Sequence, residues 1–350
     1  MSPVPAAATE PGYVVLAIRD KEVVRSLTWG VADMGIGDPM TIDTVCYVGS
    51  LAKQVVAACV ALLEHDAQLD VDDPVARWVP GLPSWAERAT VRHLVHHTSG
   101  LPAPSFGPDG LGPGGVRALS TDDRLQRVKA VDPLPSEPGE RYVYSNHGYL
   151  LLAEVVAAAA KAPLSVVARE RVFEPLDMSS SFFRDTPDVL PPGTGRGHFR
   201  ATDGTRHVEP GRFHAVGAGG LWTTARDLGA WSAMFDDDPI TGGWLPAHLS
   251  ERGRLHDGSA IHYAWGMSSR THHGLPIFSH NGSFPGWSAT MVRFPGHRTT
   301  AICLANTEDI DAGAIAFSVA DQVLANAIDP SAPHADHTRL FDTLTASHGS

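Results

Sequence analysis

The order of the predicted elements indicates an α+β fold for this chain of 350 residues, because strands at both ends enclose a mainly helical middle. β-branched residues on both sides of Arg19-Asp20-Lys21 predict a hairpin formed by residues 13–18 and 22–33. The β-rich segments toward the other end are 261–270, 275–281, 287–294 and 299–306. We therefore expect one antiparallel sheet, built from both ends of the chain and flanked by helices. An all-helical domain would be inserted between the ends, with the functional site in the cleft between the two parts.

The other elements follow from hydrophobic periodicity. A short strand is expected at 44–48, and apolar residues about every 3.6 positions then predict a helix over 50–65. Further helices are predicted over 91–97, 121–130, 147–161 and 164–172, and a closing helix over 312–327. The expected domains are a discontinuous sheet domain of residues 1–70 and 215–330, a mostly helical domain of residues 71–214, and a polar, loosely held tail of residues 331–350.

The composition argues against several classes of function. The formal net charge is −12 and no Lys/Arg-rich run occurs, so neither nucleic acid nor an anionic membrane is an expected partner. The three cysteines, at positions 46, 59 and 303, have no metal-ligand or CxxC spacing and make a poor disulfide framework. No apolar stretch approaches the ~20 residues that span a bilayer, and no signal-peptide pattern is present. A cytoplasmic location is therefore expected.

The sequence Ser50-Leu51-Ala52-Lys53 places a hydroxyl and an amine one helical turn apart. The chain has only four lysines against 23 arginines, and no other lysine follows a serine at this spacing. A serine needs an adjacent base to become a nucleophile, and a lysine whose pKa is lowered by burial can supply one. The structural alternative is a helix-capping serine with a solvated lysine. The apolar character of the surrounding helix favours a buried Lys53 over a solvated one.

Two further segments carry chemically useful groups. In Tyr144-Ser145-Asn146, before the helix over 147–161, a tyrosinate beside a lysine ammonium could act as a general base and Asn146 could orient a substrate amide. Considered alone, this segment is better explained as a helix cap. In His280-Asn281-Gly282-Ser283, Gly282 permits close approach of a substrate to the strand, and a neighbouring N–H could complete an oxyanion hole with that of Ser50. The alternative is an ordinary strand end with a surface histidine.

Together, and in this order, the three motifs resemble those of the penicillin-recognising serine hydrolases, which include class C β-lactamases, D-alanyl-D-alanine carboxypeptidases, D-aminopeptidases and β-lactamase-like carboxylesterases. The resemblance covers about residues 13–328 and implies the β-lactamase/transpeptidase-like fold. Its other supporting segments are Val91-Arg92-His93-Leu94 through His97-Thr98-Ser99-Gly100-Leu101-Pro102, Pro138-Gly139-Glu140, Phe173-Glu174-Pro175-Leu176, and Gly219-Gly220-Leu221 through Asp227-Leu228.

The resemblance implies a role for each residue of the three motifs. Ser50 would be the nucleophile that forms an acyl-enzyme, and Lys53 and Tyr144 would share the acid–base work. The backbone N–H groups of Ser50 and Ser283 would form the oxyanion hole. Asn146, His280 and Gly282 would contact the substrate, and Trp287, just past the third motif, could line the acyl pocket.

The position of His280 departs from most β-lactamases, which carry a lysine there. A histidine offers only a partial positive charge to a substrate carboxylate at neutral pH. This difference favours a serine hydrolase that acts on a small ester, amide or D-configured peptide over a dedicated β-lactamase. An acyltransferase or peptide cyclase that uses the same acyl-enzyme is one alternative. A non-catalytic, penicillin-binding-like ligand sensor is another.

No cofactor and no metal is expected. His93, His96 and His97 have a spacing that can form a metal-binding face, but no HExxH pattern or matching carboxylate accompanies them, so we interpret them as structural. His272 and His273 precede a glycine turn and are expected to be exposed. The expected partner is a small-molecule or short peptide substrate, and the oligomeric state stays open.

Overall fold

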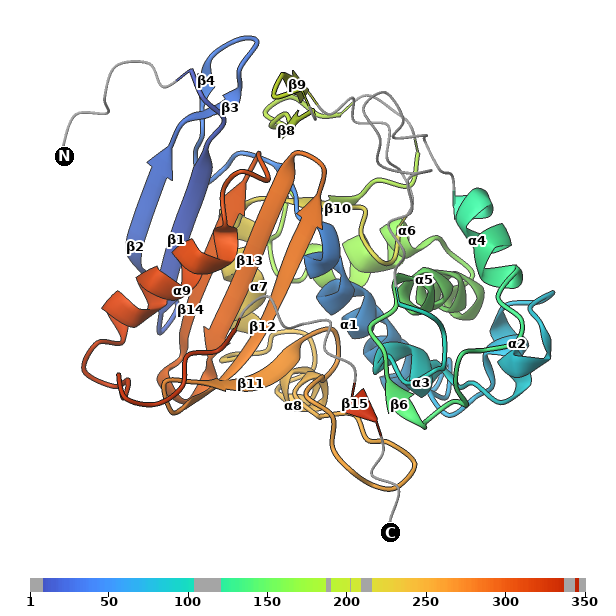
Figure 1. Ribbon diagram of the computed structural model, residues 1–350. Coiled ribbons are helices and arrows are strands. Elements are labelled where there is room, and N and C mark those ends of the chain that lie inside the picture. The colour runs from blue at the N-terminus through green and yellow to red at the C-terminus, as the bar shows by residue number, and fades with distance from the viewer. Residues whose placement is uncertain are drawn as a thin grey trace.

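A six-stranded antiparallel sheet, in the order β11-β12-β13-β14-β1-β2, forms the centre of the computed structural model (Figure 1). The structure describes residues 9–103, 121–186, 190–201, 203–208 and 216–336 and the backbone of 344–345. The strands are β1 (Tyr13–Arg19), β2 (Glu22–Trp29), β11 (Ser268–His272), β12 (Leu275–Phe284), β13 (Trp287–Phe294) and β14 (Thr299–Ala305). β1 pairs with β14 along its whole length, from Tyr13 opposite Ala305 to Arg19 opposite Thr299. The prediction of one sheet made from both ends of the chain is confirmed.

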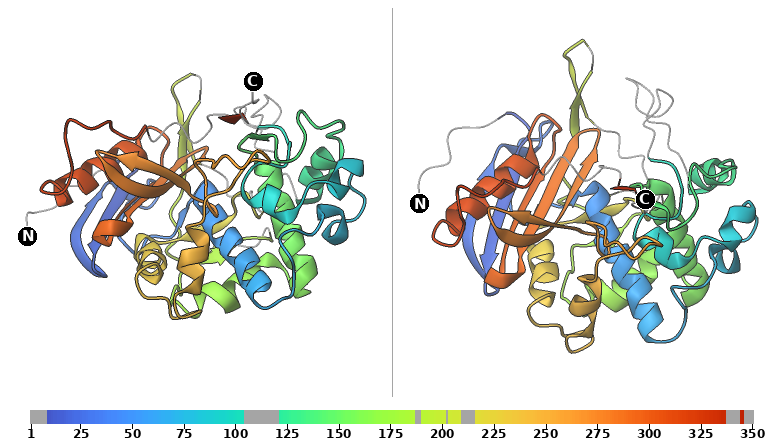
Figure 2. Two further views of the ribbon diagram at one scale, coloured as in Figure 1. Left: turned by 90° about the horizontal axis from the view of Figure 1, so that it is seen from below. Right: turned by 60° about the horizontal axis from the view of Figure 1, so that its bottom comes forward.

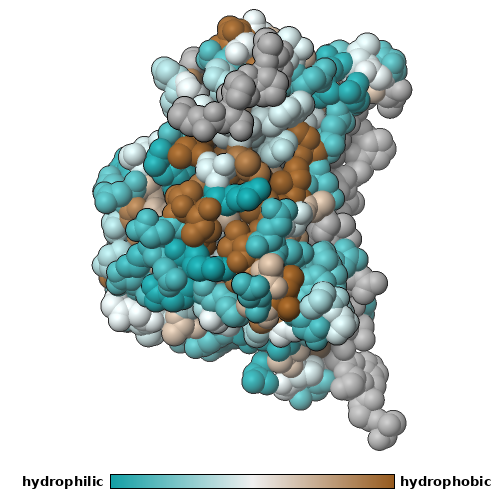
Figure 3. Space-filling model, turned by 90° about the vertical axis from the view of Figure 1, so that its left-hand side faces the viewer, coloured by the Kyte–Doolittle hydropathy of each residue, from teal (hydrophilic) through white to brown (hydrophobic). Residues whose placement is uncertain are grey.

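Strand β2 forms one edge of this sheet. The β1–β2 hairpin turns at Asp20 and Lys21, which both have positive φ angles (50° and 68°), the conformation that tight hairpin turns require. β2 is exposed along its whole length. Its apolar side chains contribute to the hydrophobic surface on this side of the molecule (Figure 3). At the other edge, the predicted strand over 261–270 is wrong for residues 261–267, because β11 begins only at Ser268.

Helices cover both faces of the sheet (Figure 2). Alternate residues of β1 point to opposite faces. Val15 and Ala17 pack in the cluster that includes α9 (Ala312–Val323), whereas Val14 and Leu16 pack in the larger cluster with α1 (Ala52–His65) and α7 (Ala225–Met234). The sheet is therefore the middle layer, with α9 on one face and α1 and α7 on the other.

Helix α1 is buried on nearly all sides, since every residue from Ala52 to Leu63 is buried. It contacts α5 (Asn146–Ala160), α6 (Leu164–Ala168) and α8 (Trp244–Leu249). The other helical segments are η1 (Gly49–Leu51), α2 (Val75–Trp78), η2 (Ser84–Glu87), α3 (Val91–Val95), α4 (Thr121–Lys129), the π-helical turn η3 (Arg169–Phe173) and η4 (Pro295–His297). The short strands are β3 (Val31–Asp33), β4 (Asp38–Pro39), β5 (Cys46–Tyr47), β6 (Arg141–Tyr142), β7 (Phe182–Phe183), β8 (His198–Arg200), β9 (Arg206–Val208), β10 (Leu221–Thr223) and β15 (Leu344–Thr345).

The described part of the C-terminal segment differs from the predicted loose tail. Leu344–Thr345 pairs with β6, and the backbone N–H of Ala335 donates to the ring of His272 at 3.1 Å. These contacts tie the segment to distant parts of the fold. The domain boundaries at residues 70, 215 and 330 stay a prediction.

Among the described residues, no single helix is both long and apolar enough to cross a membrane. Helix α5 together with Leu164–Phe173 meets the length and composition criteria only as a pair, bent by 78° at the break between them.

Asn306 joins three segments that are far apart in the sequence. Its side chain is fully buried, and its Oδ1 atom accepts a 2.7 Å hydrogen bond from the Gly12 nitrogen. Its Nδ2 atom lies 3.0 Å, 2.9 Å and 3.0 Å from the carbonyl oxygens of Val31, Ala32 and Arg196. Buried polar groups that lose such partners cost free energy, so this amide holds the end of β14 to the start of the chain.

We expect Asn306→Ala to lower the free energy of unfolding by about 3 kcal/mol, because it leaves several buried backbone groups without hydrogen bonds. Urea unfolding followed by circular dichroism measures the change. Asn326→Ala, at an exposed position after α9, is the matched control and should change stability by less than about 0.5 kcal/mol. Equal stability of the two variants would contradict the structural role of Asn306.

Candidate active site

Ser50 and Lys53 lie on consecutive turns at the start of α1, where the short η1 turn leads into the helix. The Lys53 Nζ atom is 2.9 Å from Ser50 Oγ. Ser50 is half-buried and reachable from outside, whereas Lys53 is fully buried. The predicted helix therefore brings the two groups into hydrogen-bond contact, and the alternative of a solvated lysine does not hold.

Two further oxygen atoms contact the Lys53 amine. Nζ lies 2.9 Å from Asn146 Oδ1, at the start of α5, and 2.8 Å from the carbonyl oxygen of Ala218. Both of these oxygens can only accept hydrogen bonds. A neutral amine can satisfy them with its two N–H groups and keep its lone pair for the Ser50 hydroxyl. Burial disfavours the charged form and lowers the pKa of Lys53 well below its usual value, which favours this neutral arrangement.

The Ala218 carbonyl reaches Lys53 because the backbone at Gly217 and Gly219 lies very close to neighbouring segments of the chain. A Cβ atom on Gly217, whose φ is 109°, would lie 2.4 Å from the Tyr149 carbonyl oxygen. One on Gly219 would lie 2.4 Å from the Tyr47 hydroxyl. Only glycine fits at both positions, which explains the glycines of this segment in physical terms.

Tyr144 lies beside this pair, on the loop that precedes α5. Its ring centroid is 5.0 Å from Lys53 Nζ and its side chain is almost completely buried. Burial raises the pKa of Tyr144 above its usual value, while a hydrogen bond with Ser50 acts in the opposite direction. The phenol is therefore protonated at neutral pH, and a tyrosinate is not the resting form.

His97 fixes the loop that carries Tyr144. Its Nδ1 atom accepts a 3.1 Å hydrogen bond from the Ser145 backbone N–H, and its ring stacks at a tilt on that of Tyr144, with centroids 4.4 Å apart. Burial lowers the pKa of His97 well below its usual value, so the ring is neutral and free to accept this bond. The interpretation of His97 as structural agrees with these contacts.

The third motif lies on β12, against the segment that contains Ser50. A Cβ atom on Gly49 would lie 2.8 Å from the Ser283 nitrogen, and one on Gly282 would lie 1.9 Å from the Val48 carbonyl oxygen and 3.2 Å from the Ser50 nitrogen. The two backbones can approach this closely only because both positions are glycine. The nitrogens of Ser50 and Ser283 consequently lie on facing segments, as the oxyanion-hole prediction requires.

His280 is buried rather than exposed at a strand end. Its Nδ1 atom is 2.7 Å from the Asn281 carbonyl oxygen, and its Nε2 atom is 3.1 Å from the Tyr263 hydroxyl. Nδ1 therefore donates and Nε2 accepts, which describes a neutral ring. Burial lowers the pKa of His280 to about 3. His280 supplies no positive charge at neutral pH, not even the partial one expected from the sequence.

Trp287 lies on the other side of the motif and is buried in the core. Its ring meets that of Trp222 edge to face, with centroids 5.5 Å apart, and only 2% of the residue is exposed. A Cβ atom on Gly197 would lie 2.3 Å from its Nε1 atom. These contacts are those of a packing residue, and a substrate contact by Trp287 stays a prediction.

The sequence did not point to Tyr263 or to the Ala218 carbonyl. A backbone oxygen has no side-chain signature, and the glycines around Ala218 were the only available sign of it. Tyr263 lies outside the three motifs, and its contact with His280 depends on the path of residues 249–267, which local sequence patterns did not predict.

The histidines at 93, 96 and 97 are held by separate structural contacts. His93 completes a capping box with Thr90 at the start of α3. His96 meets Trp265 edge to face, and His97 accepts from Ser145. Each ring is used in packing or in backbone hydrogen bonds.

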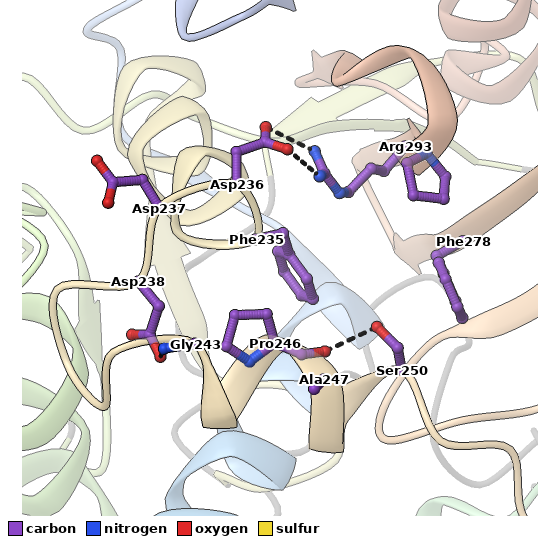
Figure 4. Close-up of a pocket in the computed structure, with 11 residues that line it drawn as sticks. Phe235, Asp236, Asp237, Asp238, Gly243, Pro246, Ala247, Ser250, Phe278 and Arg293 are labelled. Atoms are coloured by element: carbon purple, nitrogen blue, oxygen red, sulfur yellow. Dashed lines mark hydrogen bonds and ion pairs between the residues drawn. The ribbon is translucent and has the colours of Figure 1, made fainter.

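A hollow of about 330 Å³ lies between α7, α8 and the sheet, away from these residues (Figure 4). The carboxylate of Asp236 and the guanidinium of Arg293 form a paired contact at its edge, with nitrogen–oxygen distances of 3.2 Å and 2.7 Å. None of the lining residues belongs to the three motifs. We interpret the contact between Asp236 and Arg293 at its edge as a structural ion pair.

Comparisons with known proteins place this geometry in a family. The β-lactamase family matches residues 2–324. Penicillin-binding protein 4* of Bacillus subtilis is 28% identical over 320 residues, which cover 84% of this chain and 68% of that protein. A D-aminopeptidase of Brucella anthropi is also 28% identical, over 88% of this chain but only 58% of its own length.

Solved structures share the fold. An octameric penicillin-binding protein homologue from Pyrococcus abyssi has a TM-score of 0.81 at 22% identity, over 90% of this chain and 74% of that one. The D-amino acid amidase of Ochrobactrum anthropi SV3, in complex with L-phenylalanine amide, has a TM-score of 0.70 at 25% identity, over 85% and 86% of the two chains. The predicted β-lactamase/transpeptidase-like fold is confirmed.

The family match spans nearly the whole chain, and the neighbouring structures share its fold over most of its length. The chain therefore belongs to the β-lactamase family, within the penicillin-recognising serine hydrolases.

Proposed function

We propose that this protein is a serine hydrolase that cleaves amides or esters of D-configured amino acids through an acyl-enzyme on Ser50. The observation that carries the proposal is the contact between Ser50 Oγ and a fully buried lysine amine whose other two partners are acceptors. This arrangement provides a neutral base in contact with the hydroxyl that it has to deprotonate.

In the acylation step, Ser50 Oγ attacks the substrate carbonyl carbon and its proton passes to Lys53 Nζ. The carbonyl oxygen becomes an oxyanion, which the N–H groups of Ser50 and Ser283 stabilise. The new ammonium keeps three acceptors, since Ser50 Oγ now accepts as Asn146 and Ala218 already do. The proton transfer therefore breaks no hydrogen bond of the lysine.

Collapse of the tetrahedral intermediate breaks the bond to the leaving amine or alcohol, which needs a proton. Tyr144 is protonated at neutral pH and lies beside both Ser50 and Lys53. In our proposal Tyr144 gives its proton to the leaving group and recovers one from the Lys53 ammonium. Water then attacks the acyl-enzyme by the same steps in reverse and regenerates Ser50.

Two observations support the proposed substrate class. Relatives of this chain are named D-aminopeptidase and D-amino acid amidase. In addition, the neutral His280 offers no charge for a substrate carboxylate, which a penicillin or a free peptide C-terminus carries. An amide or ester without that carboxylate avoids an unpaired charge in the site.

We expect Ser50→Ala to abolish the adduct with a fluorophosphonate probe and to lower kcat/KM for a p-nitrophenyl ester by at least about 10³-fold. Intact-mass spectrometry and ester hydrolysis measure these effects. Ser105→Ala, outside the three motifs, is the control substitution. Undiminished labelling of Ser50→Ala would exclude Ser50 as the nucleophile.

The pH dependence tests Lys53. Because the neutral amine is the active form and burial lowers its pKa, kcat/KM should rise with pH through a value below the 10.5 of an ordinary lysine. Lys53→Met should lose this rise and about 10³-fold in rate, whereas Lys161→Met, at an exposed position, should keep both. A Lys53→Met enzyme with the wild-type pH profile would show that another group is the base.

A panel of substrates tests the acyl group and the acceptor. We expect D-phenylalanine amide to be hydrolysed at least about tenfold faster than its L-enantiomer, with a cephalosporin turned over slowly or only as a persistent adduct. Liquid chromatography with added D-amino-acid ester and amine acceptors measures the products. A preference for the L-enantiomer would contradict the proposed stereochemistry. If the main product is instead the acyl group joined to an added acceptor, or a cyclic product, the enzyme catalyses acyl transfer or cyclisation and not hydrolysis.

A further inference from the structure

A second group of polar side chains gathers where the turn between β11 and β12 meets α9. It consists of His272, His273, Asp321 and His334, and we call it the histidine–aspartate cluster. Each member offers one nitrogen or oxygen atom, and these atoms all lie within 4.8 Å of one another. The cluster is on the α9 face of the sheet, since the His272 ring contacts Phe294 and Phe317, whereas Ser50 lies on the α1 face.

The expectation that His272 is exposed is wrong, because its side chain is completely buried. Its Nδ1 atom accepts the 3.1 Å hydrogen bond from the Ala335 N–H. The proton is therefore on Nε2, which donates to Asp321 Oδ1 at 2.7 Å. His272 thus orients the carboxylate through one oxygen and leaves Oδ2 available.

His273 presents a lone pair toward that second oxygen. Its Nδ1 atom is 2.9 Å from the Ala332 carbonyl oxygen, to which it donates, so Nε2 carries the lone pair. Nε2 lies 4.0 Å from Asp321 Oδ2. A metal-binding histidine commonly donates its other N–H to a backbone carbonyl in this way. Bond lengths to zinc of roughly 2.0–2.2 Å and tetrahedral angles place two ligand atoms about 3.4 Å apart, so a closure of about 0.6 Å between these two atoms lets one ion bind both.

His334 closes the group from the chain that follows α9. Its ring centroid is 4.5 Å from that of His272 and 5.3 Å from that of His273. The residue is exposed, so its ring can shift toward an ion without repacking the core. The segment that carries His334 is already attached to the β11–β12 turn, because the backbone N–H of His273 donates to the Pro333 carbonyl oxygen at 3.0 Å.

We propose that His273 Nε2, Asp321 Oδ2 and a ring nitrogen of His334 bind one Zn²⁺ ion. Water completes the four-coordinate site, and His272 holds the carboxylate in place. Imidazole and carboxylate donors in a tetrahedral arrangement suit zinc, whereas calcium and magnesium prefer oxygen ligands alone. The ion would join the β11–β12 turn, α9 and the chain after α9, so its role is structural and separate from the reaction at Ser50.

Untagged protein, freed of metal with a chelator and dialysed, tests the site. We expect isothermal titration calorimetry to show one equivalent of Zn²⁺ bound, and Co²⁺ to give the intense visible absorption of a four-coordinate site with nitrogen and oxygen ligands. Saturating Zn²⁺ should raise the melting temperature by roughly 3–5 °C, because it binds only the folded state. Hydrolysis of an ester by the protein should be unchanged.

His334→Ala changes an exposed side chain and should fold normally, yet it should weaken Zn²⁺ binding at least tenfold and abolish the thermal shift. His273→Ala should do the same. His207→Ala, an exposed histidine on β9, is the matched control and should bind as the wild type does. If the wild type and His334→Ala give the same Zn²⁺ titration, the proposal is overturned. The cluster would then be a hydrogen-bonded group alone.

Discussion

The burial of the Lys53 amine beside Ser50 is the constraint on which the rest of the site depends. A fully buried amine at the start of an apolar helix has to be neutral or surrounded by acceptors, because an unpaired buried charge is costly. Here the hydrogen-bond partners of the amine come from three segments: the η1 turn with Ser50, the start of α5 with Asn146, and the Ala218 carbonyl. The positions of α5 and of the glycine-rich loop relative to α1 therefore determine the hydrogen bonds of the Lys53 amine.

The fourth segment of the site is β12, which close contact between backbones positions against the segment that contains Ser50. β12 belongs to the sheet and is paired with β13 from Phe278 opposite Arg293 to Phe284 opposite Trp287. This register fixes Gly282 and Ser283 along the strand. The glycines at 49 and 282 then allow the strand to lie against the Ser50 segment with no side chain between them. In the proposed mechanism the two oxyanion donors are rigid for this reason, since one belongs to a helix start and the other to a central strand.

Local patterns were sufficient to predict the sheet, α1 and the three motifs, because hairpin residues, helical periodicity and motif spacing are properties of short segments. Contacts made by distant segments were not predictable in this way. Residues 261–267 look like a strand, but the Tyr263 carbonyl accepts from Gly253 and the Ala264 N–H donates to Met267, so the segment is folded on itself. The burial of His272 likewise depends on Ala335, 63 positions later in the chain. The domain limits and the catalytic roles still await a test.

The aromatic group around Lys53 explains why this lysine can act as the base in the proposed attack. His97, Tyr144, Tyr263 and His280 pack ring to ring, and burial moves every one of their pKa values toward the neutral form. Among the described residues, no carboxylate forms a hydrogen bond or ion pair with the amine that would stabilise its ammonium form. When the proposed attack occurs, the only new charges are the Lys53 ammonium and the oxyanion. These opposite charges arise together in a site of low dielectric constant, where their attraction is strong and favours the transition state over the resting enzyme.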